Sequence, residues 1–421
     1  MKVTSVDPVL LDIPFDAEHE RNMAREVNAS HIVQVCRVAA DNGLVGYGEA
    51  LVHGTGSGPV TDAAVARVMG RNPFDLMWDD SLGAVLQIAL FDLAGKAAGV
   101  PVYRLLGDKV RDWCPISWWS VDMPKEDFAA QAQAADAQGY TINRIKARPW
   151  FDIREQVAAI CAVVPASFRL SIDLDGYLLD SSTALCLLKD LERFSNVAYL
   201  KQPLPYDDFA GHRRLRARIR PAIVMHYGSL SPVSTALREE VCDGFIIRGG
   251  ASEMVQNAAV AAMANKPFGL QIQGMATGIG TAFLLHFGAV LSHCRWPAMT
   301  GMHIYAHQLL MEPLAVHGGY CRVPDAPGLG VTVDEAALER FATVSPVREN
   351  LRAIYVVIRP SGELTYYGQA RQYVEDFRRG NHRVFEPGVR FRVLTDDGGE
   401  GWAEFYGRLQ AGPLRSSAEL L

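Results

Sequence analysis

Short apolar runs alternate with longer amphipathic stretches through the middle of the chain, from about residue 114 onward. The runs are rich in Val, Ile and Leu, whereas stretches such as 125–139 and 153–165 repeat their apolar positions at helical spacing. Strand–helix units in series predict a parallel barrel with its helices outside. The strands expected from the pattern are residues 115–121, 143–148, 168–175, 197–203, 222–228, 243–249, 268–274 and a segment near 296–301.

The N-terminal region has a different pattern. Residues 3–13 and 31–40 read as strands, and the glycines of 42–50 indicate a turn into a third strand. Residues 81–99 then repeat their apolar positions at helical spacing. These features predict a small α+β unit before the barrel.

The C-terminal region consists of short strand-like runs joined by Gly, Pro and Asp turns, which predict a small β-rich extension. The runs expected as strands are residues 351–360, 363–368, 388–396 and 401–407. The chain therefore divides into three parts. Their expected bounds are 1–113 for the N-terminal domain, 114–341 for the barrel domain, whose tail near 323–341 returns to the first domain, and 342–421 for the extension.

The length and charge of the chain limit the classes of protein it can belong to. A chain of 421 residues is too long for one small core and predicts two or three domains. With 41 basic and 47 acidic residues, the formal net charge of -6 argues against a nucleic-acid partner held through phosphate contacts.

The seven cysteines are scattered and form no CxxC pair, so neither a disulfide framework nor a structural zinc site is expected. The first residues lack a signal-peptide pattern, and no apolar run reaches the length of a membrane span. We therefore expect a cytoplasmic protein with no nucleic-acid or membrane partner.

Three stretches resemble framework motifs of one superfamily. Residues 88–107, IALFDLAGKAAGVPVYRLLG, are similar to the ALWDLAGKAxGxPVYxLLG segment of the enolase superfamily. The turn VGYGEA at 45–50 matches its GxGE segment, and VPDAPGLGVTVDE at 323–335 matches its PDGPGLGVxxDE tail. Over roughly residues 1–341 the chain resembles the mandelate racemase/muconate lactonizing branch. Such motifs specify a fold and say little about chemistry.

The resemblance implies an enolase-like α/β fold, with a TIM-type barrel of seven or eight strand–helix units below an N-terminal α+β capping domain. It also implies a mechanism in which barrel carboxylates hold magnesium, the metal binds a substrate carboxylate, and a base removes the neighbouring proton. Members of this family assemble as homo-oligomers, and we expect the same here.

The ends of the second and third barrel strands carry the first candidate residues. Lys146 matches the first lysine of the family's Lys-x-Lys pair, whereas Arg148 replaces the second, and a guanidinium does not release a proton at usable pH. Asp173 matches the first metal ligand, and Asp175 stands where the family usually has Asn. Two residues apart on a strand, both aspartates point to the same face.

The fourth and fifth strands depart further from the family. Lys201, in YLKQPLP, stands in place of the second carboxylate ligand. The third carboxylate aligns with His226, or alternatively with Tyr227. Magnesium prefers hard oxygen ligands, and an ammonium would repel it. We therefore expect no metal and no other cofactor: Asp173, Lys201 and His226 would be vestigial ligand positions, with the cation of Lys201 where the metal was.

The later strands complete the candidate cavity. Arg248 precedes a Gly-Gly pair, and Gln273, with Gln271 pointing the same way, stands where many members carry a catalytic His. An amide cannot serve as a proton base. All these residues are predicted to face one cavity. The catalytic candidates are Lys146, Arg148, Lys201 and His226, and the substrate-binding candidates are Asp173, Asp175, Arg248, Gln271 and Gln273.

The leading hypothesis is an enzyme that acts on a small carboxylic acid by proton abstraction alpha to the carboxylate, as in racemisation, dehydration or cycloisomerisation. Lys146 would be the base if neighbouring cations lower its pKa. The alternative is a non-catalytic barrel that binds a ligand or a partner. Structural readings also stay open: His226 as a buried packing histidine, and Arg248 as the partner of an outer carboxylate.

Overall fold

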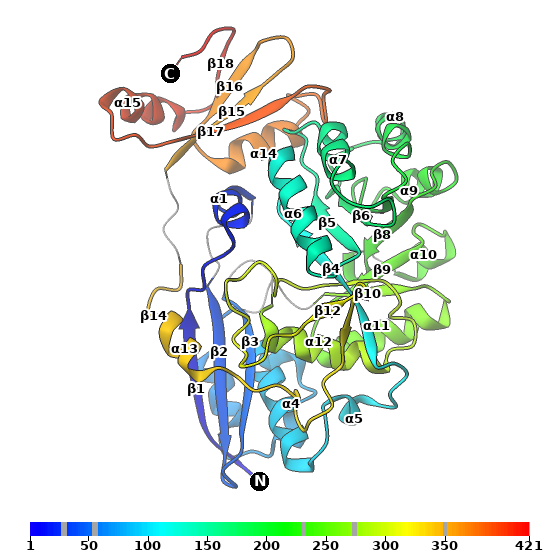
Figure 1. The fold of residues 1–421 in the computed structure, drawn as a ribbon, viewed down its shortest axis with the longest axis vertical. Helices are drawn as coiled ribbons and strands as arrows, with labels where there is room; N and C mark the ends of the chain where they lie inside the picture. The colour runs from blue at the N-terminus through cyan, green and yellow to red at the C-terminus, as the bar shows by residue number, and fades with distance from the viewer. Residues whose placement is uncertain (27–31, 53–57, 230–232, 272–275, 348–351, 421) are drawn as a thin grey trace.

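The computed structural model describes residues 1–26, 32–52, 58–229, 233–271, 276–347 and 352–420. Figure 1 shows the N-terminal domain at one end, the barrel beside and above it, and the C-terminal extension at the other end. Within the described residues, no helix is both long enough and apolar enough to cross a membrane.

Parallel strands form the predicted barrel. Strands β4 to β10 lie side by side in chain order, and β11 pairs with β4. Bridges between Gln271 and Met299 and between Phe268 and Cys294 join the last strands, so the sheet closes. The strands are β4 Trp113–Ser120, β5 Ile142–Lys146, β6 Arg169–Asp173, β7 Val197–Lys201, β8 Ala222–His226, β9 Gly244–Ile247, β10 Phe268–Leu270 and β11 Ala298–Met299.

Helices follow the strands on the outside of the barrel. They are α6 Lys125–Ala137, α7 Ile153–Cys161, α8 Ser181–Leu191, α9 Phe209–Arg216, α10 Val233–Arg238, α11 Ala251–Met263 and α12 Gly278–Val290, with a 3-10 turn η2 at Tyr227–Ser229. A hairpin of β12 Val316–His317 and β13 Tyr320–Arg322 extends the sheet, because β13 pairs with β4 in the antiparallel sense. The fold predicted from the strand–helix alternation is confirmed.

The N-terminal domain is an antiparallel sheet covered by helix α4. The strands β1 Val3–Leu11, β2 Val33–Ala40 and β3 Val45–Leu51 pair in order, and β14 Ala342–Thr343 pairs with β1, so the tail of the barrel returns to this sheet. The helices are α1 Ala17–Glu26, α2 Asp62–Val68, α3 Pro73–Leu76, η1 Asp80–Leu82, α4 Ala84–Ala98, α5 Tyr103–Leu106 and α13 Glu335–Phe341.

The three motifs meet at one buried carboxylate, that of Asp92 in α4. Its Oδ2 accepts hydrogen bonds from the Tyr47 backbone N–H at 2.9 Å and from Lys96 Nζ at 2.7 Å. Its Oδ1 accepts one from the Leu329 backbone N–H at 2.8 Å. A Cβ on Gly48 would lie 2.0 Å from the Val85 carbonyl oxygen, so only glycine lets β3 approach α4 this closely. Through Asp92, the three motifs therefore join the N-terminal domain to the tail of the barrel domain.

The C-terminal extension is a four-stranded antiparallel sheet, and alternate residues of its strands pack against two different helices, so each face carries one helix. Its elements are β15 Ala353–Ile358, β16 Leu364–Tyr367, α14 Ala370–Arg378, β17 Arg390–Thr395, α15 Glu400–Leu409 and β18 Leu414–Ser416. The expected strand at 401–407 is wrong, because this segment lies in α15. Trp402, Phe405 and Leu409 are buried at spacings of three and four residues, which is the period of a helix.

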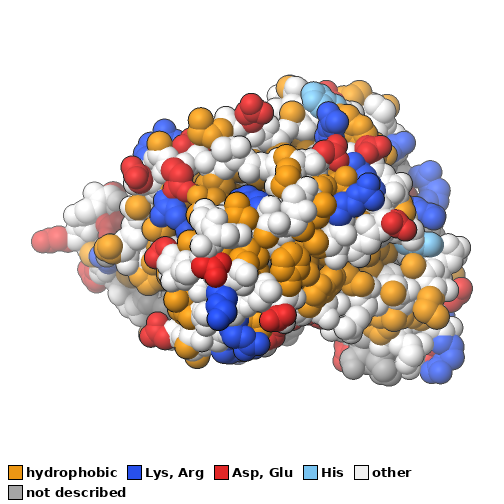
Figure 2. All heavy atoms as spheres, turned by 90° about the horizontal axis from the view of Figure 1, so that it is seen from below, with side chains coloured by type: hydrophobic (Ala, Val, Ile, Leu, Met, Phe, Trp, Pro, Cys, Tyr) orange, Lys and Arg blue, Asp and Glu red, His pale blue; other side chains and the backbone are white. Residues whose placement is uncertain are grey.

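The surface carries both signs of charge. Figure 2 shows Lys and Arg side chains interspersed with Asp and Glu on the face seen from below, around apolar side chains. This distribution is consistent with the near-balanced composition.

Candidate active site

Three neighbouring strands bring charged side chains together at their carboxyl ends. In the sheet register Lys146 of β5 pairs with Asp173 of β6, which pairs with Lys201 of β7. The Lys201 Nζ atom lies 2.8 Å from both Oδ1 and Oδ2 of Asp173. The Lys146 Nζ atom lies 3.1 Å from Oδ2 of the same carboxylate, whose side chain is 3% exposed. Two ammonium groups thus share one buried carboxylate.

Asp175 lies in the turn after β6 with a φ of 44°, a left-handed conformation that few non-glycine residues adopt. Its Oδ2 accepts hydrogen bonds from Lys146 Nζ at 2.9 Å and Arg148 Nη2 at 2.7 Å, and its Oδ1 accepts one from Lys201 Nζ at 3.3 Å. Burial alone would raise the pKa of Asp175, but these three cations outweigh it and hold the pKa well below its usual value. Asp175 is therefore ionised.

Arg148 is the most deeply buried of these cations, with 1% of its side chain exposed. Its Nη1 donates to the Ala147 carbonyl oxygen at 2.9 Å, and its guanidinium lies 5.4 Å from the centroid of the Tyr177 ring. A carboxylate, a carbonyl and an aromatic face therefore hold Arg148. It can fix the position of Asp175, but it cannot take up a proton.

His226, at the end of β8, is buried. Its Nδ1 atom has no hydrogen-bond partner within the described residues. Burial lowers the pKa of His226 well below its usual value, and the nearby charges of Lys201, Arg248, Arg144 and Lys146 lower it further. The ring is therefore neutral at neutral pH, and both the burial and the free nitrogen are compatible with a packing role or a chemical one.

The other candidates lie around this network in different settings. Arg248 follows β9 and is exposed. Gln271 is buried beside the bridge to β11. Tyr227 turns its ring against Phe245, with centroids 5.2 Å apart. Gln273, also predicted to line the cavity, lies outside the described residues.

The C-terminal extension packs on the two loops that carry Arg148 and Asp175. Trp150 lies edge-on to Tyr373, with ring centroids 4.6 Å apart, and 6.1 Å from Phe391. The guanidinium of Arg378 in α14 lies 5.4 Å from the ring centroid of Tyr177. Figure 1 shows α14 beside α6 and α7 at this end of the barrel. The extension therefore holds the residues next to the candidate site.

Sequence reasoning missed one charged residue of the barrel interior. Arg144 precedes Lys146 by two positions on β5, so it faces the same side, and it is 7% exposed. The alternation of side chains along a strand was the signal that could have found it.

The described residues do not suit magnesium. Magnesium prefers octahedral oxygen ligands, whereas here the ammonium of Lys201 already lies between the oxygens of Asp173. No group of three or more His, Cys, Asp or Glu residues that could hold a metal occurs in the described part of the chain. The two carboxylates at these strand ends, Asp173 and Asp175, are already paired with lysine and arginine side chains of the protein.

Comparisons with known proteins agree with this architecture. The family model "Enolase C-terminal domain-like" matches residues 127–337 and so ends before the extension. A chloromuconate cycloisomerase of Cupriavidus pinatubonensis is 26% identical over 385 residues, covering 82% of this chain and all of that protein. An o-succinylbenzoate synthase of Geobacillus stearothermophilus is 27% identical over 273 residues, covering 63% of this chain and 71% of that protein.

Among solved structures, the N-succinyl Arg/Lys racemase of Bacillus cereus superposes with a TM-score of 0.67 at 20% identity, covering 82% of this chain and 98% of that one. The fold is thus that of an enolase-like barrel with its capping domain. The chain belongs to the mandelate racemase/muconate lactonizing enzyme family of the enolase superfamily. It is an enzyme of the isomerase or lyase kind, as its curated relatives are.

Proposed function

We propose that this enzyme removes the proton alpha to the carboxylate of a small organic acid, with the Lys201 ammonium in the position where the family uses a divalent metal. The observation that carries the proposal is the pair of 2.8 Å contacts between Lys201 Nζ and the two oxygens of Asp173. An ammonium in this cradle brings positive charge to the strand ends without a metal ion.

The charge of the network favours an anionic substrate. Lys146, Arg148 and Lys201 carry three positive charges, whereas Asp173 and Asp175 carry two negative charges. The excess positive charge at a partly buried strand end attracts a carboxylate. Arg248, exposed beside His226, adds to it.

The substrate carboxylate would approach the most exposed members of the network. The side chains of Lys146 and Asp175 are 18% and 27% exposed, whereas that of Lys201 is 4% exposed. The 3.3 Å contact between Lys201 and Asp175 is the longest contact of Lys201, so it is the one that a substrate oxygen would replace.

Two side chains differ in their capacity for a proton. Lys146 donates to Asp173 and Asp175, and two carboxylates favour its ammonium form. His226 is neutral and has a ring nitrogen without a partner in the described residues. A neutral imidazole has room for a proton, whereas an ammonium group has one to give. The burial and the cations that keep His226 neutral also weaken it as a base, so the negative charge of a bound substrate would have to offset them. We therefore propose His226 as the proton acceptor and Lys146 as the donor, reversing the role expected for Lys146.

The test is exchange of the alpha proton in deuterated water. The protein, treated with a chelator, is incubated with a panel of small mono- and dicarboxylic acids, and loss of the alpha-proton signal is followed by proton NMR. We expect exchange on at least one acid without added magnesium. The variants Lys201→Met and His226→Asn should lose it by about 100-fold or more. Lys189→Met, a half-exposed lysine of α8, should keep it.

Two outcomes contradict the proposal. If exchange requires magnesium, Lys201 does not replace the metal. If no acid of the panel exchanges under either condition, the reaction does not proceed by alpha-proton removal.

A further inference from the structure

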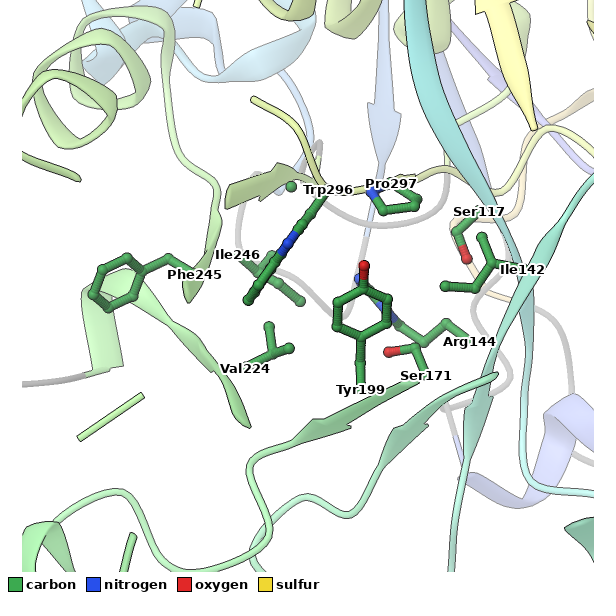
Figure 3. Close-up of a pocket in the computed structure, with 11 residues that line it drawn as sticks. Ser117, Ile142, Arg144, Ser171, Tyr199, Val224, Phe245, Ile246, Trp296 and Pro297 are labelled. Atoms are coloured by element: carbon green, nitrogen blue, oxygen red, sulfur yellow. The ribbon is translucent and has the colours of Figure 1, made fainter. Parts of the chain in front are cut away.

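The floor of the barrel, at the end opposite the candidate active site, holds a small cavity around Arg144. Figure 3 shows Arg144 among the hydroxyl groups of Ser117, Ser171 and Tyr199, with Trp296 on the other side of the hollow. The cavity volume is about 10 Å³. A volume of roughly 10–15 Å³ is enough for one water-sized occupant, so the cavity has the size of a single water molecule or a single small ion.

The guanidinium of Arg144 is poorly neutralised. Within the described residues its Nε and Nη1 atoms are buried and make no hydrogen bond. Burial lowers the pKa of Arg144 to about 10, so it stays charged at neutral pH. Asp173 is the carboxylate that acts on it most strongly, yet Lys201 and Lys146 already share that carboxylate.

A buried charge without a partner is strongly destabilising, and an arginine cannot escape the cost by losing its proton. Among the described residues, Arg144 and the charged network at the other end of the strands together comprise four cations, Arg144, Lys146, Arg148 and Lys201, and the two carboxylates of Asp173 and Asp175. At the mouth of the barrel, which is the end with the candidate active site, a substrate carboxylate can offset the excess positive charge. The floor requires a separate negative charge.

We infer that the barrel floor binds a small monatomic anion of the chloride class, held by the unpartnered N–H groups of Arg144. The inference stands on the cavity and the orphan guanidinium and does not depend on the proposed reaction.

The surroundings of Arg144 suit such an anion. The hydroxyls of Ser171 and Tyr199 also face the hollow and are donors of the kind that an anion accepts from. Ser117 Oγ donates to the Trp118 carbonyl at 2.6 Å, so its proton is already used. The ring centroids of Tyr199 and Trp296 lie 5.1 Å apart, and both residues are partly exposed. An ion from solvent would therefore enter the cavity beside these two rings.

A water molecule fits the same space but leaves the charge in place. A neutral water can accept hydrogen bonds from one or two of the guanidinium N–H groups, whereas an anion also neutralises the charge of the guanidinium. The two occupants therefore differ in a measurable way: only the anion makes stability depend on halide concentration at constant ionic strength.

The first measurement is the anomalous scattering of bromide in crystals of the full-length protein. We expect a peak within hydrogen-bonding distance of Arg144 Nε and Nη1. A cavity that contains only water in the presence of bromide would overturn the inference.

The second measurement is the melting temperature in sodium chloride against sodium methanesulfonate, whose anion is too large for the cavity, at equal ionic strength. Chloride should raise the melting temperature of the wild type by about 2–4 °C. Arg144→Met, which removes the charge, should abolish this difference. Arg193→Met, at an arginine whose side chain is 79% exposed, should retain it. An equal chloride effect in Arg144→Met would place the anion elsewhere and refute the assignment.

Discussion

The two ends of the barrel differ in how their buried cations are neutralised. The mouth is the end at which the strands carry the candidate site, and the floor is the opposite end around Arg144. At the mouth, Lys146 at the end of β5 and Arg148 in the loop directly after it donate to the carboxylate of Asp175, which their charges help to keep ionised. At the floor, Arg144 of the same strand has two buried nitrogens without a partner among the described residues. The protein thus neutralises much of its own charge at one end and leaves the other end to a ligand.

This difference separates two uses of a buried charge. A network of opposite charges with good hydrogen bonds is costly to break, because removal of one member leaves the others buried and unpaired. A lone cation in a cavity is already unpaired, so its removal costs little and its ligand can be exchanged. The network therefore gives the mouth a fixed geometry on which catalysis can depend. Occupancy of the floor cavity instead depends on the anion concentration of the solution.

The largest effect is expected for Lys201→Met. This change leaves the carboxylate of Asp173 with Lys146 as its remaining ammonium partner in the network, so the free energy of unfolding should fall by about 3–5 kcal/mol. Urea denaturation measures it. The surface change Lys189→Met should stay within about 0.5 kcal/mol of wild type. A loss in Lys201→Met as small as that of the control would mean that the network does not hold the mouth together.

The next loss of stability is expected when the contact between the C-terminal extension and the mouth of the barrel is removed. Trp150 is fully buried against Tyr373, Phe377 and Phe391. Trp150→Ala should lower the free energy of unfolding by about 3–5 kcal/mol through the cavity it creates. Trp78→Ala, at a tryptophan that is 37% exposed, should cost clearly less. Equal costs would show that the extension is not packed on the mouth as described.

A smaller effect concerns Glu49, a buried carboxyl group that has no cationic partner among the described residues. Glu49 accepts hydrogen bonds from Thr277 and from the Gly280 backbone N–H, and burial raises its pKa to about 7. Between about pH 4.5 and 7 the folded state binds more protons here than the unfolded state, so the stability that Glu49 contributes falls as the pH rises. Glu49→Gln should flatten this part of the stability–pH curve. An unchanged slope would contradict the raised pKa.

Much of the fold could be predicted from the sequence, because its signals are local. The alternation of apolar runs with amphipathic stretches predicts the parallel strands, and the three motifs around Asp92 indicate how the domains join. The error at 401–407 came from taking a short run next to Gly and Asp turn residues as a strand, although the burial of Trp402, Phe405 and Leu409 follows a helical period.

The candidate site was predictable to the extent that strand ends meet. Asp173, Lys146 and Lys201 converge because parallel strands in register place their ends side by side. Sequence alone does not show how charges are shared, which is why Lys146 was expected as a base although two carboxylates hold it as an ammonium. The packing of Trp150 on the extension also depends on contacts between residues far apart in the sequence.

The most direct test of the central claim, that Lys201 stands in for the metal, is a magnesium titration of the melting temperature in the wild type and in Lys201→Glu. A site that binds only the native state raises stability by about 2.7 kcal/mol at a hundredfold excess over its Kd. We predict no shift for the wild type and a magnesium-dependent rise for Lys201→Glu, which restores a carboxylate at that position. A wild-type protein that carries about one magnesium per chain, or a Lys201→Glu variant with unchanged metal affinity, would contradict the account.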